Sequence, residues 1–387
     1  MFNPELFQMR QEATMAAMNH VEGAYVPISA NAGGAGLAWG GKTFWEVCGD
    51  PQAYATALNK IYEDLWCDMV TTNGIFGTFG MEEHFGPDVQ YTIAPDGVSL
   101  THVQRPFMEK DEYPLLIEDP SKLIINKMIP RRWPQFVEDR EWAKQAIQKV
   151  AMNTAYTYGM LSAAAYQDVA QDKNVFPIMN GQMTFQNPLD TIFDYFRGFK
   201  NTITDLRRQP DNVKAACDKL WEVKCEPMMA KPMESPFPYP IHYAHIPAYL
   251  SPKQFREIYW PYEKKFIEWC ASQGSKLILI VEGRWEPVLD VFLDLPKDSC
   301  VLYIDDDDIF KVNELLGDHQ IIVGGIKMVN CRMKTADEVM DDVKKVIDTC
   351  APGGGFILTT DKAWVTPGDI TQTLVDVYNQ AHEYGKK

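Results

Sequence analysis

Two short apolar runs separated by one amphipathic segment limit the folds that this chain can adopt. The runs are LILIV at 277–281 and CVLYI at 300–304, and each ends abruptly in acidic residues. Continuous apolar runs of this length are typical of parallel strands that are buried on both faces. The stretch therefore predicts a β-α-β unit. Glu282 and Asp305 to Asp308 stand at the carboxyl ends of its strands, where parallel sheets bind their ligands.

The same alternation of strand and helix continues through the last third of the chain and favours a closed (β/α)8 TIM barrel over an α+β fold. We expect one domain over residues 1–387, with an N-terminal helical and β elaboration over about 1–65 and a β-rich insertion over about 81–105. A helix over 3–19, capped by Asn3, is expected to close one end of the barrel. The remaining strands are predicted at 68–72, 175–179, 241–245, 321–324 and 356–359, and the later helices at 252–273, 286–294, 309–316, 335–350 and 367–384.

A glycine-rich stretch over 30–41 precedes these elements. It has neither the spacing of a P-loop nor that of a dinucleotide-binding loop. Two interpretations remain, a flexible wall or lid over a pocket and a plain structural loop. Under the first, Trp39 and Phe44 are candidates for an aromatic lining.

Charge and cysteine usage exclude several classes of partner. The net charge is −16, from 37 basic and 53 acidic residues, and basic residues cluster only in pairs. Nucleic acid and anionic membranes are therefore poor partners. The eight cysteines form no CxxC pair, and the sequence has no signal-peptide pattern and no apolar run near 18 residues. We expect free thiols and a cytoplasmic location.

Three segments of the second half resemble a known family. They are HYAHIPAYLSPKQFREIYWPYEKKFIEW at 242–269, LIVEGRWEPVLD at 279–290, and GDHQIIVGGIKM at 317–328 with MKTADEVMDDVKKVIDTCAPGGGFILTT at 333–360. They resemble the uroporphyrinogen decarboxylase-like superfamily and, within it, the corrinoid-dependent methyltransferases, especially the methyltransferase I components of anaerobic O-demethylases. The likeness covers about 230–385 strongly and the first half loosely.

The resemblance implies a TIM barrel whose carboxyl-end mouth docks a separate protein carrying cobalamin. It also implies transfer of a methyl group from a methylated donor to cob(I)alamin. This chain lacks the DxHxxG segment with which relatives hold the corrinoid, so the cobalamin is expected on a partner corrinoid protein. A homodimer is also compatible with the resemblance.

Two departures from the family bear on the reaction. A true uroporphyrinogen decarboxylase needs an arginine-rich mouth for its polycarboxylate substrate, and Arg10 is the sole arginine in the first hundred residues. Relatives that methylate a thiol hold zinc through an HxC pair, where this chain has Ile280-Val281-Glu282. A zinc site that includes harder, oxygen-containing ligands remains an alternative, and its candidate ligands are Glu282, Cys331 and Asp361.

The reaction implied by the resemblance asks for a proton donor or a Lewis acid. Demethylation of an aryl methyl ether releases a phenolate, and because phenol has a pKa of about 10 it leaves poorly without such help. Glu282 is the first candidate, as an acid whose pKa is raised by desolvation or as a metal ligand. A structural carboxylate that pairs with Arg284 or caps the next helix is the alternative.

Two histidines are the next candidates. His242 and His245 lie three residues apart near a strand end, so they should face opposite sides, and only one should point into the barrel. Either is a candidate second proton donor or ligand, or a hydrogen-bonded structural histidine. His84, beside Glu82 and Glu83, is a weaker candidate.

The remaining candidates are placed by the rule that barrel chemistry lies at the carboxyl ends of strands. Asp305, Asp306 and Asp361 are expected at the mouth, with no more than one of Asp305 to Asp308 functional. Cys331 is a thiolate ligand or a buried thiol. Aromatic residues expected near the mouth, where they would suit an aromatic ring or the corrin face, are Trp39, Phe44, Trp66, Tyr243, Trp285 and Trp364.

The sequence thus favours a methyltransferase that demethylates a methoxylated aromatic of the guaiacol or veratrol type and passes the methyl group to cob(I)alamin on a corrinoid protein. Transfer from a methylcorrinoid to tetrahydrofolate or a thiol, decarboxylation of the uroporphyrinogen type, and a non-catalytic binding barrel are the alternatives.

Overall fold

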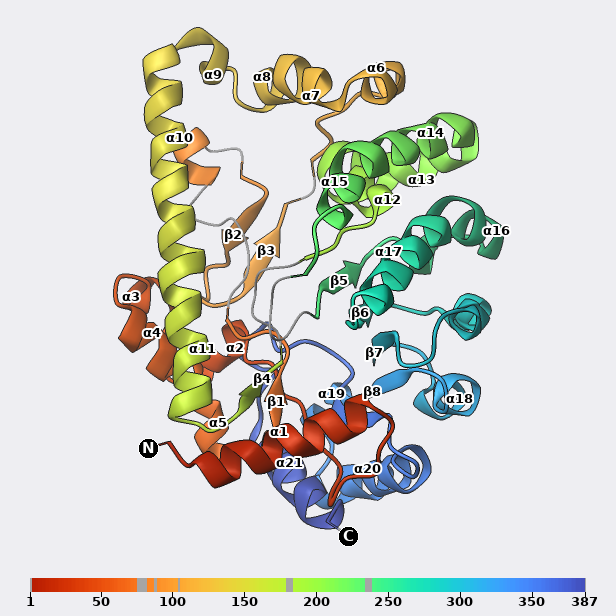
Figure 1. Ribbon diagram of the computed structural model, residues 1–387. Helices are drawn as coiled ribbons and strands as arrows, with labels where there is room; N and C mark the ends of the chain where they lie inside the picture. Colours follow the sequence, from red (N-terminus) through yellow and green to blue (C-terminus); the bar gives the residue numbers. More distant parts are fainter. Residues whose placement is uncertain are drawn as a thin grey trace.

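The fold is an α/β arrangement in which parallel strands lie inside a layer of helices (Figure 1). The computed structural model describes residues 2–74, 82–86, 89–103, 105–178, 184–233 and 239–386. Its strands are β1 (Met69–Val70), β2 (Tyr91–Ile93), β3 (Leu100–His102), β4 (Phe176–Pro177), β5 (Ile241–Ala244), β6 (Leu277–Val281), β7 (Cys300–Ile304), β8 (Ile321–Ile326) and β9 (Phe356–Thr360).

Helices connect and cover the strands. The α-helices are α1 (Pro4–Met18), α2 (Gly34–Trp39), α3 (Phe44–Val47), α4 (Pro51–Leu58), α5 (Ile61–Asp64), α6 (Tyr113–Glu118), α7 (Pro120–Leu123), α8 (Ile129–Arg132), α9 (Gln135–Glu138), α10 (Arg140–Thr154), α11 (Ser162–Gln171), α12 (Pro188–Thr191), α13 (Gly198–Arg208), α14 (Pro210–Leu220), α15 (Glu226–Met229), α16 (Pro252–Gln254), α17 (Trp260–Ser272), α18 (Ile309–Leu316), α19 (Met328–Met333), α20 (Ala336–Cys350) and α21 (Gln372–Tyr384). Short 3₁₀ or π-helical segments are η1 (Glu82–Phe85), η2 (Ile124–Met128), η3 (Ala155–Leu161), η4 (Ile192–Arg197), η5 (Trp221–Cys225), η6 (Pro247–Tyr249), η7 (Phe255–Tyr259) and η8 (Glu286–Asp294).

The strands pair in parallel from β5 to β9. The order is β5-β6-β7-β8-β9, and β1 pairs with β4 in a second parallel sheet. Single bridges continue the pairing, because Ile28 pairs with Leu358 of β9 and Ser29 pairs with Met69 of β1. Between β4 and β5, the described residues show only the bridge from Thr184 to Ile241. The α/β class is confirmed, whereas the described strands do not form one closed sheet.

Side chains on the parallel strands alternate between two clusters. Ile278 of β6 and Val301 of β7 belong to an inner cluster, whereas Leu277 and Leu279 of β6 belong to a larger cluster that includes the surrounding helices. This alternation is the period-two geometry of a strand. Continuous apolar runs result because both faces are buried.

Helix α1 covers the amino ends of the strands, at the bottom of Figure 1. Met18, which is fully buried, packs in the inner cluster against strand residues that include Ile278 and Val301. The helix begins as predicted, because the side chain of Asn3 accepts a hydrogen bond from the Leu6 backbone N–H at 3.2 Å. The amino end of the strands is therefore filled, and the carboxyl end is left for ligands.

The glycine-rich stretch over 30–41 is not a loop throughout, because it forms helix α2. A Cβ atom at Gly33 would lie 2.6 Å from the Trp364 carbonyl oxygen, and one at Gly34 would lie 2.8 Å from the Val365 carbonyl oxygen. Glycine at these two positions allows backbones to approach closely. Residues 34–39 are therefore a packed helix instead of a loop, whereas residues 31–34 line a cavity, as the interpretation of this stretch as a pocket wall predicted.

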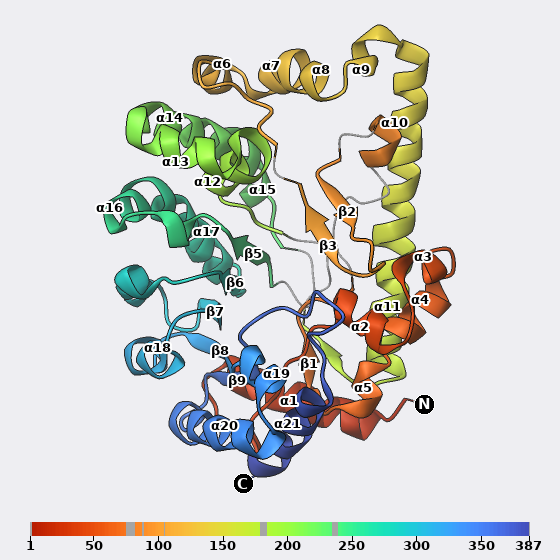
Figure 2. The same cartoon turned by 180° about the vertical axis from the view of Figure 1, so that it is seen from behind.

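The N-terminal half adds a long helical rod beside the strands. Helices α10 and α11, joined through η3, run along one side of the molecule, as Figures 1 and 2 show from opposite directions. Strands β2 and β3 form an antiparallel pair within the range predicted to be β-rich, although residues 81, 87, 88 and 104 lie outside the described part. None of the described helices combines the length and the apolar composition that a membrane span requires.

Candidate active site

A cavity of about 550 Å³ opens at the carboxyl ends of the strands. Its wall comes from β5, β6, β7 and β9, from the segments that follow β6, β7 and β9, and from residues 31–34, 71, 72 and 74. Apolar side chains such as Ile241, Ile280 and Val98 make much of the wall. The lining groups that carry or can carry charge, or that carry a phenol hydroxyl, are Glu282, Asp305, Asp361, Lys362, Tyr243 and Tyr303.

Two of the cavity carboxylates are neutralised by lysines. Asp305 forms an ion pair with Lys362 and accepts a hydrogen bond from the Gly283 backbone N–H at 2.9 Å. Asp361 Oδ2 lies 3.3 Å from Lys327 Nζ, and its Oδ1 accepts a hydrogen bond from the Met328 N–H at 2.9 Å. Both carboxylates thus have partners that hold them in place.

Glu282 follows β6 and faces a histidine rather than a lysine. Its side chain is 41 % exposed and lines the cavity. His245 Nε2 lies 3.6 Å from Glu282 Oε1. Burial raises the pKa of Glu282, the charge of His245 opposes this, and the nearby carboxylate of Asp305 adds to it. A carboxyl with a raised pKa is suited to donating a proton.

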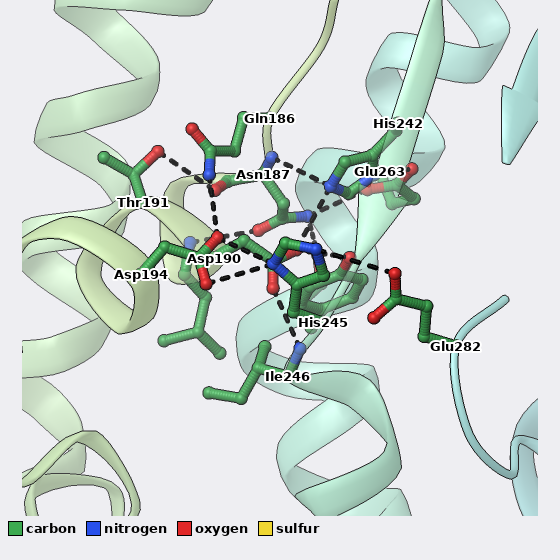
Figure 3. Close-up of polar contacts among 12 residues, drawn as sticks. Gln186, Asn187, Asp190, Thr191, Asp194, His242, His245, Ile246, Glu263 and Glu282 are labelled. Atoms are coloured by element: carbon green, nitrogen blue, oxygen red, sulfur yellow. Dashed lines mark hydrogen bonds and ion pairs between the residues drawn. The ribbon is translucent and has the colours of Figure 1, made fainter. Parts of the chain in front are cut away.

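His245, just beyond the end of β5, is held by a second carboxylate (Figure 3). Its Nδ1 lies 2.9 Å from Asp194 Oδ2, and the Asp194 side chain is only 3 % exposed. Burial of the ring lowers its pKa, but the hydrogen bond with Asp194 and the charges of Asp194 and Glu282 outweigh burial and raise the pKa of His245 to about 9. Asp194, His245 and Glu282 therefore form a chain in which a cationic imidazole is directed at the cavity carboxyl.

The raised pKa of His245 predicts a pH dependence of stability. Because the pKa rises from 6.5 to about 9 on folding, the protonated ring stabilises the fold fully below pH 6.5, and this contribution is lost as the pH rises through about 9. We expect the difference in free energy of unfolding between the wild type and His245→Gln to shrink as the pH increases. Urea titrations between about pH 6 and about pH 10 measure it, and a difference that stays constant would contradict the assignment.

The two candidate histidines lie on different sides of the sheet, as expected. His242 is fully buried on the outer side of β5, where it contacts Asp190 and Glu263 instead of the cavity. Tyr243, between them in sequence, points inward and lines the cavity. The structure therefore brings His245, but not His242, to Glu282.

Only some of the predicted aromatic residues line the cavity. Tyr243 and Trp364 do, whereas the other four belong to packing or to hydrogen bonds elsewhere. Trp285 is 1 % exposed and packs against Phe255. The three others are Trp39, whose Nε1 donates to Asp64 at 2.8 Å, Trp66, whose Nε1 donates to Asp68 at 3.0 Å, and Phe44, which packs against Tyr54. Trp39, Phe44 and Trp285 are thus engaged outside the cavity lining, the first by a hydrogen bond and the other two by aromatic packing.

The four aspartates after β7 have four different roles. Asp305 lines the cavity, and Asp306 lies 2.8 Å from Lys362 without lining it. Asp307 accepts the N–H groups of Trp285 and Glu286, and Asp308 caps helix α18. Asp308 therefore has a helix-capping role and Asp307 a structural role in the loop before η8, so half of this acidic run is structural.

The remaining candidates are also accounted for. Cys331 is buried outside the cavity lining, His84 contacts Asn153 at 2.7 Å, and Arg284 pairs with Glu286 instead of Glu282. Over the described ranges, three or more His, Cys, Asp or Glu side chains nowhere gather as a metal-ligand set. The zinc ligands suggested from sequence, Glu282, Cys331 and Asp361, are thus not brought together.

Several site residues were not predicted from the sequence. Asp190 and Asp194 stand four residues apart after Asn187-Pro188, a helix start, so they share one helical face, and this spacing was a usable signal. Lys327 and Lys362 gave no signal, because their partners are distant in the sequence.

Comparisons with known proteins agree with this architecture. A family model described as uroporphyrinogen decarboxylase (URO-D) matches residues 190–361, which carry β5 to β9 as well as Asp190 and Asp194. No curated protein sequence matches the chain. The solved structure of a methyltransferase from Methanosarcina mazei is similar to it, with a TM-score of 0.57 and 15 % identity over 97 % of this chain and 98 % of that one. At this identity the likeness concerns the fold.

Proposed function

We propose that this protein is a methyltransferase that demethylates a methoxylated aromatic and passes the methyl group to cob(I)alamin on a separate corrinoid protein. The observation that carries the proposal is the chain from Asp194 through His245 to Glu282, which ends in a largely apolar cavity. Such a chain supplies a proton at one point of a wall that otherwise suits an aromatic ring. The URO-D match and the fold of the M. mazei methyltransferase support the class of enzyme.

The role proposed for this chain's residues is proton supply to the leaving oxygen. The methyl carbon loses its bond to oxygen and forms a bond to the partner's cob(I)alamin, which provides the electron pair. The pair of the broken C–O bond stays on the oxygen, which takes the proton of Glu282 and leaves as a phenol. Solvent that enters the emptied cavity then returns a proton to Glu282, while His245, whose pKa is raised to about 9, stays protonated.

The charges of the cavity favour this reaction over decarboxylation of a polycarboxylate. Among the described lining residues Lys362 is the one lysine or arginine, and it is already paired with Asp305. The other carboxylates of the described lining, Asp361 and Glu282, add no cation to the wall, and the lysine that pairs with Asp361 lies outside the lining. A substrate with many carboxylates would therefore find no unpaired lysine or arginine in the described lining to balance its charge.

The proposal assigns the cobalamin to the partner and routes no step through zinc. The described residues offer no gathered set of zinc ligands, so the proton of Glu282 takes the part that a Lewis acid would otherwise play.

We also propose that the strands close into a (β/α)8 ring. The bridges at Ile28, Ser29 and Thr184 support it, because they link β9, β1 and β5 to their neighbours around such a ring.

The test is an anaerobic assay with a corrinoid protein reduced to cob(I)alamin. We expect that adding guaiacol or veratrol produces the visible spectrum of methylcobalamin together with the free phenol, and that a boiled sample produces neither. If no aryl ether reacts, but preformed methylcobalamin is demethylated by a pterin or a thiol, the direction proposed here is wrong and the second-stage reaction replaces it. A protein inactive in both directions would point to a non-catalytic barrel.

A further inference from the structure

His242 lies in a buried ionic cluster behind the active-site strand. Its ring is fully buried, with Nδ1 2.9 Å from Glu263 Oε1 on α17 and Nε2 3.1 Å from Asp190 Oδ2 on α12. Both carboxylate side chains are 0 % exposed. Figure 3 draws these contacts together with those of His245.

Each ring nitrogen of His242 has a carboxylate oxygen within hydrogen-bond distance, and both carboxylates accept a hydrogen bond when both nitrogens carry protons. The backbone N of Asn187 also lies 3.4 Å from Nε2. Burial lowers the pKa of His242, but the charge of Glu263 and the hydrogen bonds with Asp190 and Glu263 outweigh burial and raise it to about 10. The contacts thus favour a protonated ring between the two buried carboxyl groups. Asn187 Nδ2 donates to Glu263 at 3.0 Å and satisfies a further carboxylate oxygen.

Asp190 connects this cluster to the active site. Its Oδ2 accepts hydrogen bonds from His242 and, at 2.8 Å, from the Tyr259 hydroxyl. Its Oδ1 accepts the backbone N–H of Ile246 at 2.9 Å, and Ile246 directly follows His245. Asp194, one helical turn after Asp190, holds the His245 ring itself. One helical segment thus fixes both the backbone and the ring of the active-site histidine.

We propose that His242 is a positioning residue, which holds Asp190 in the orientation that fixes the Ile246 backbone and so directs His245 at Glu282. The consequence for catalysis rests on the function proposed above, whereas the geometric claim does not. A cluster that served stability alone would need both ion pairs equally. The positioning role needs the contact with Asp190 and not the contact with Glu263.

Two substitutions of His242 separate these roles. In His242→Gln the amide stands where Nε2 stands, so it can still donate to Asp190. In His242→Asn the amide stands where Nδ1 stands, so it can still donate to Glu263. Each variant removes the same buried imidazole and one of its two hydrogen bonds to a carboxylate, so the two are matched in charge and in the number of hydrogen bonds lost.

The readout is the titration of His245, followed by NMR of ¹³C-labelled histidine in the full chain. The chain has 7 histidines, and His245→Asn identifies the signal by its loss. We expect His245 to titrate lower in His242→Asn than in His242→Gln by about one pH unit, which is a tenfold change in its protonation equilibrium. The reason is that in His242→Asn the ring of His245 is no longer held against Asp194 and Glu282. With an active donor, kcat should fall about tenfold further in His242→Asn than in His242→Gln, with KM alike in both.

Equal titration of His245 in both variants would overturn the proposal. If His242→Asn does not fold, His242→Gln is compared with the wild type instead. Loss of the His242 charge by itself favours the protonated form of His245, so a His245 that titrates at or above the wild-type value supports the proposal because the contact with Asp190 is kept, and a lower titration overturns it. The titrations need no substrate, so a protein inactive on every methyl ether would refute the proposed function and leave this test standing.

Discussion

Replacing Glu282 by glutamine is expected to lower kcat for demethylation by about 10²–10⁴-fold, the usual contribution of a positioned general acid. Glutamine keeps the size of the side chain and a hydrogen-bonding group near His245, but it has no carboxyl proton to give to the departing oxygen. Since the Glu282 side chain is 41 % exposed and lines the cavity, the fold should be retained. Single-turnover methyl transfer to the corrinoid protein measures the rate, and circular dichroism with thermal unfolding verifies the fold.

A neighbouring carboxylate provides the matched control. Asp306 lies close to the same mouth and contacts Lys362 at 2.8 Å, but it does not line the cavity. Asp306→Asn makes the same chemical change at a side chain outside the cavity lining. We therefore expect kcat within about twofold of the wild type, which is far less than the effect of losing a general acid. Equal losses in both variants would show that charge at the mouth, rather than a proton from Glu282, controls the rate.

Replacing Arg197 by methionine is expected to cost about 3–5 kcal/mol in free energy of unfolding. Arg197 Nε lies 2.7 Å from Asp205 Oδ2, with both side chains nearly buried at 6 % and 5 % exposure. The same arginine donates to the Met108 carbonyl, and Tyr113 donates to Asp205 at 3.1 Å. Methionine fills the space but leaves the charge of Asp205 buried without its cation. Urea unfolding, monitored by tryptophan fluorescence, measures the loss.

An exposed ion pair of the same type makes the comparison decisive. Arg256 Nη2 lies 2.7 Å from Asp290 Oδ1, but these side chains are 42 % and 57 % exposed. Arg256→Met should therefore cost less than about 1 kcal/mol, because solvent screens the pair. The double variant Arg197→Met with Asp205→Leu should recover much of the loss, since it removes the unpaired charge as well. Similar costs for Arg197→Met and Arg256→Met would contradict the argument from burial.

The parts of the fold that the sequence predicted well are those where one physical signal dominates. Strands β6 and β7 and helix α18 begin and end where predicted, because buried parallel strands are continuous apolar runs that stop at acidic residues. The pairing around Ile28 was missed, since it consists of single bridges without an apolar run of its own. Helix α2 was missed because its glycines, which permit close backbone contact, also indicate a loop.

For the candidate site, the sequence predicted positions better than partners. Glu282 and Asp305 were placed at the mouth by their position after strands, and both line the cavity. The lysine that pairs with Asp305, and the aspartate that holds His245, come from segments far away in the chain. Such pairs depend on the complete fold, and a local pattern does not specify them. Trp285 was placed at the mouth from its position in the sequence, but its side chain does not line the cavity. It packs against Phe255 in a buried aromatic cluster instead.

The plug that Met18 forms at the amino end of the strands has a kinetic consequence. With that end filled, the methyl donor and the corrinoid protein of the proposed reaction share one entrance. A docked partner would cover the donor, so the donor has to enter first, and the phenol leaves only after the partner has moved away. The order of binding and release is thereby set at the end of the molecule opposite to the chemistry, by a helix that touches no reactant.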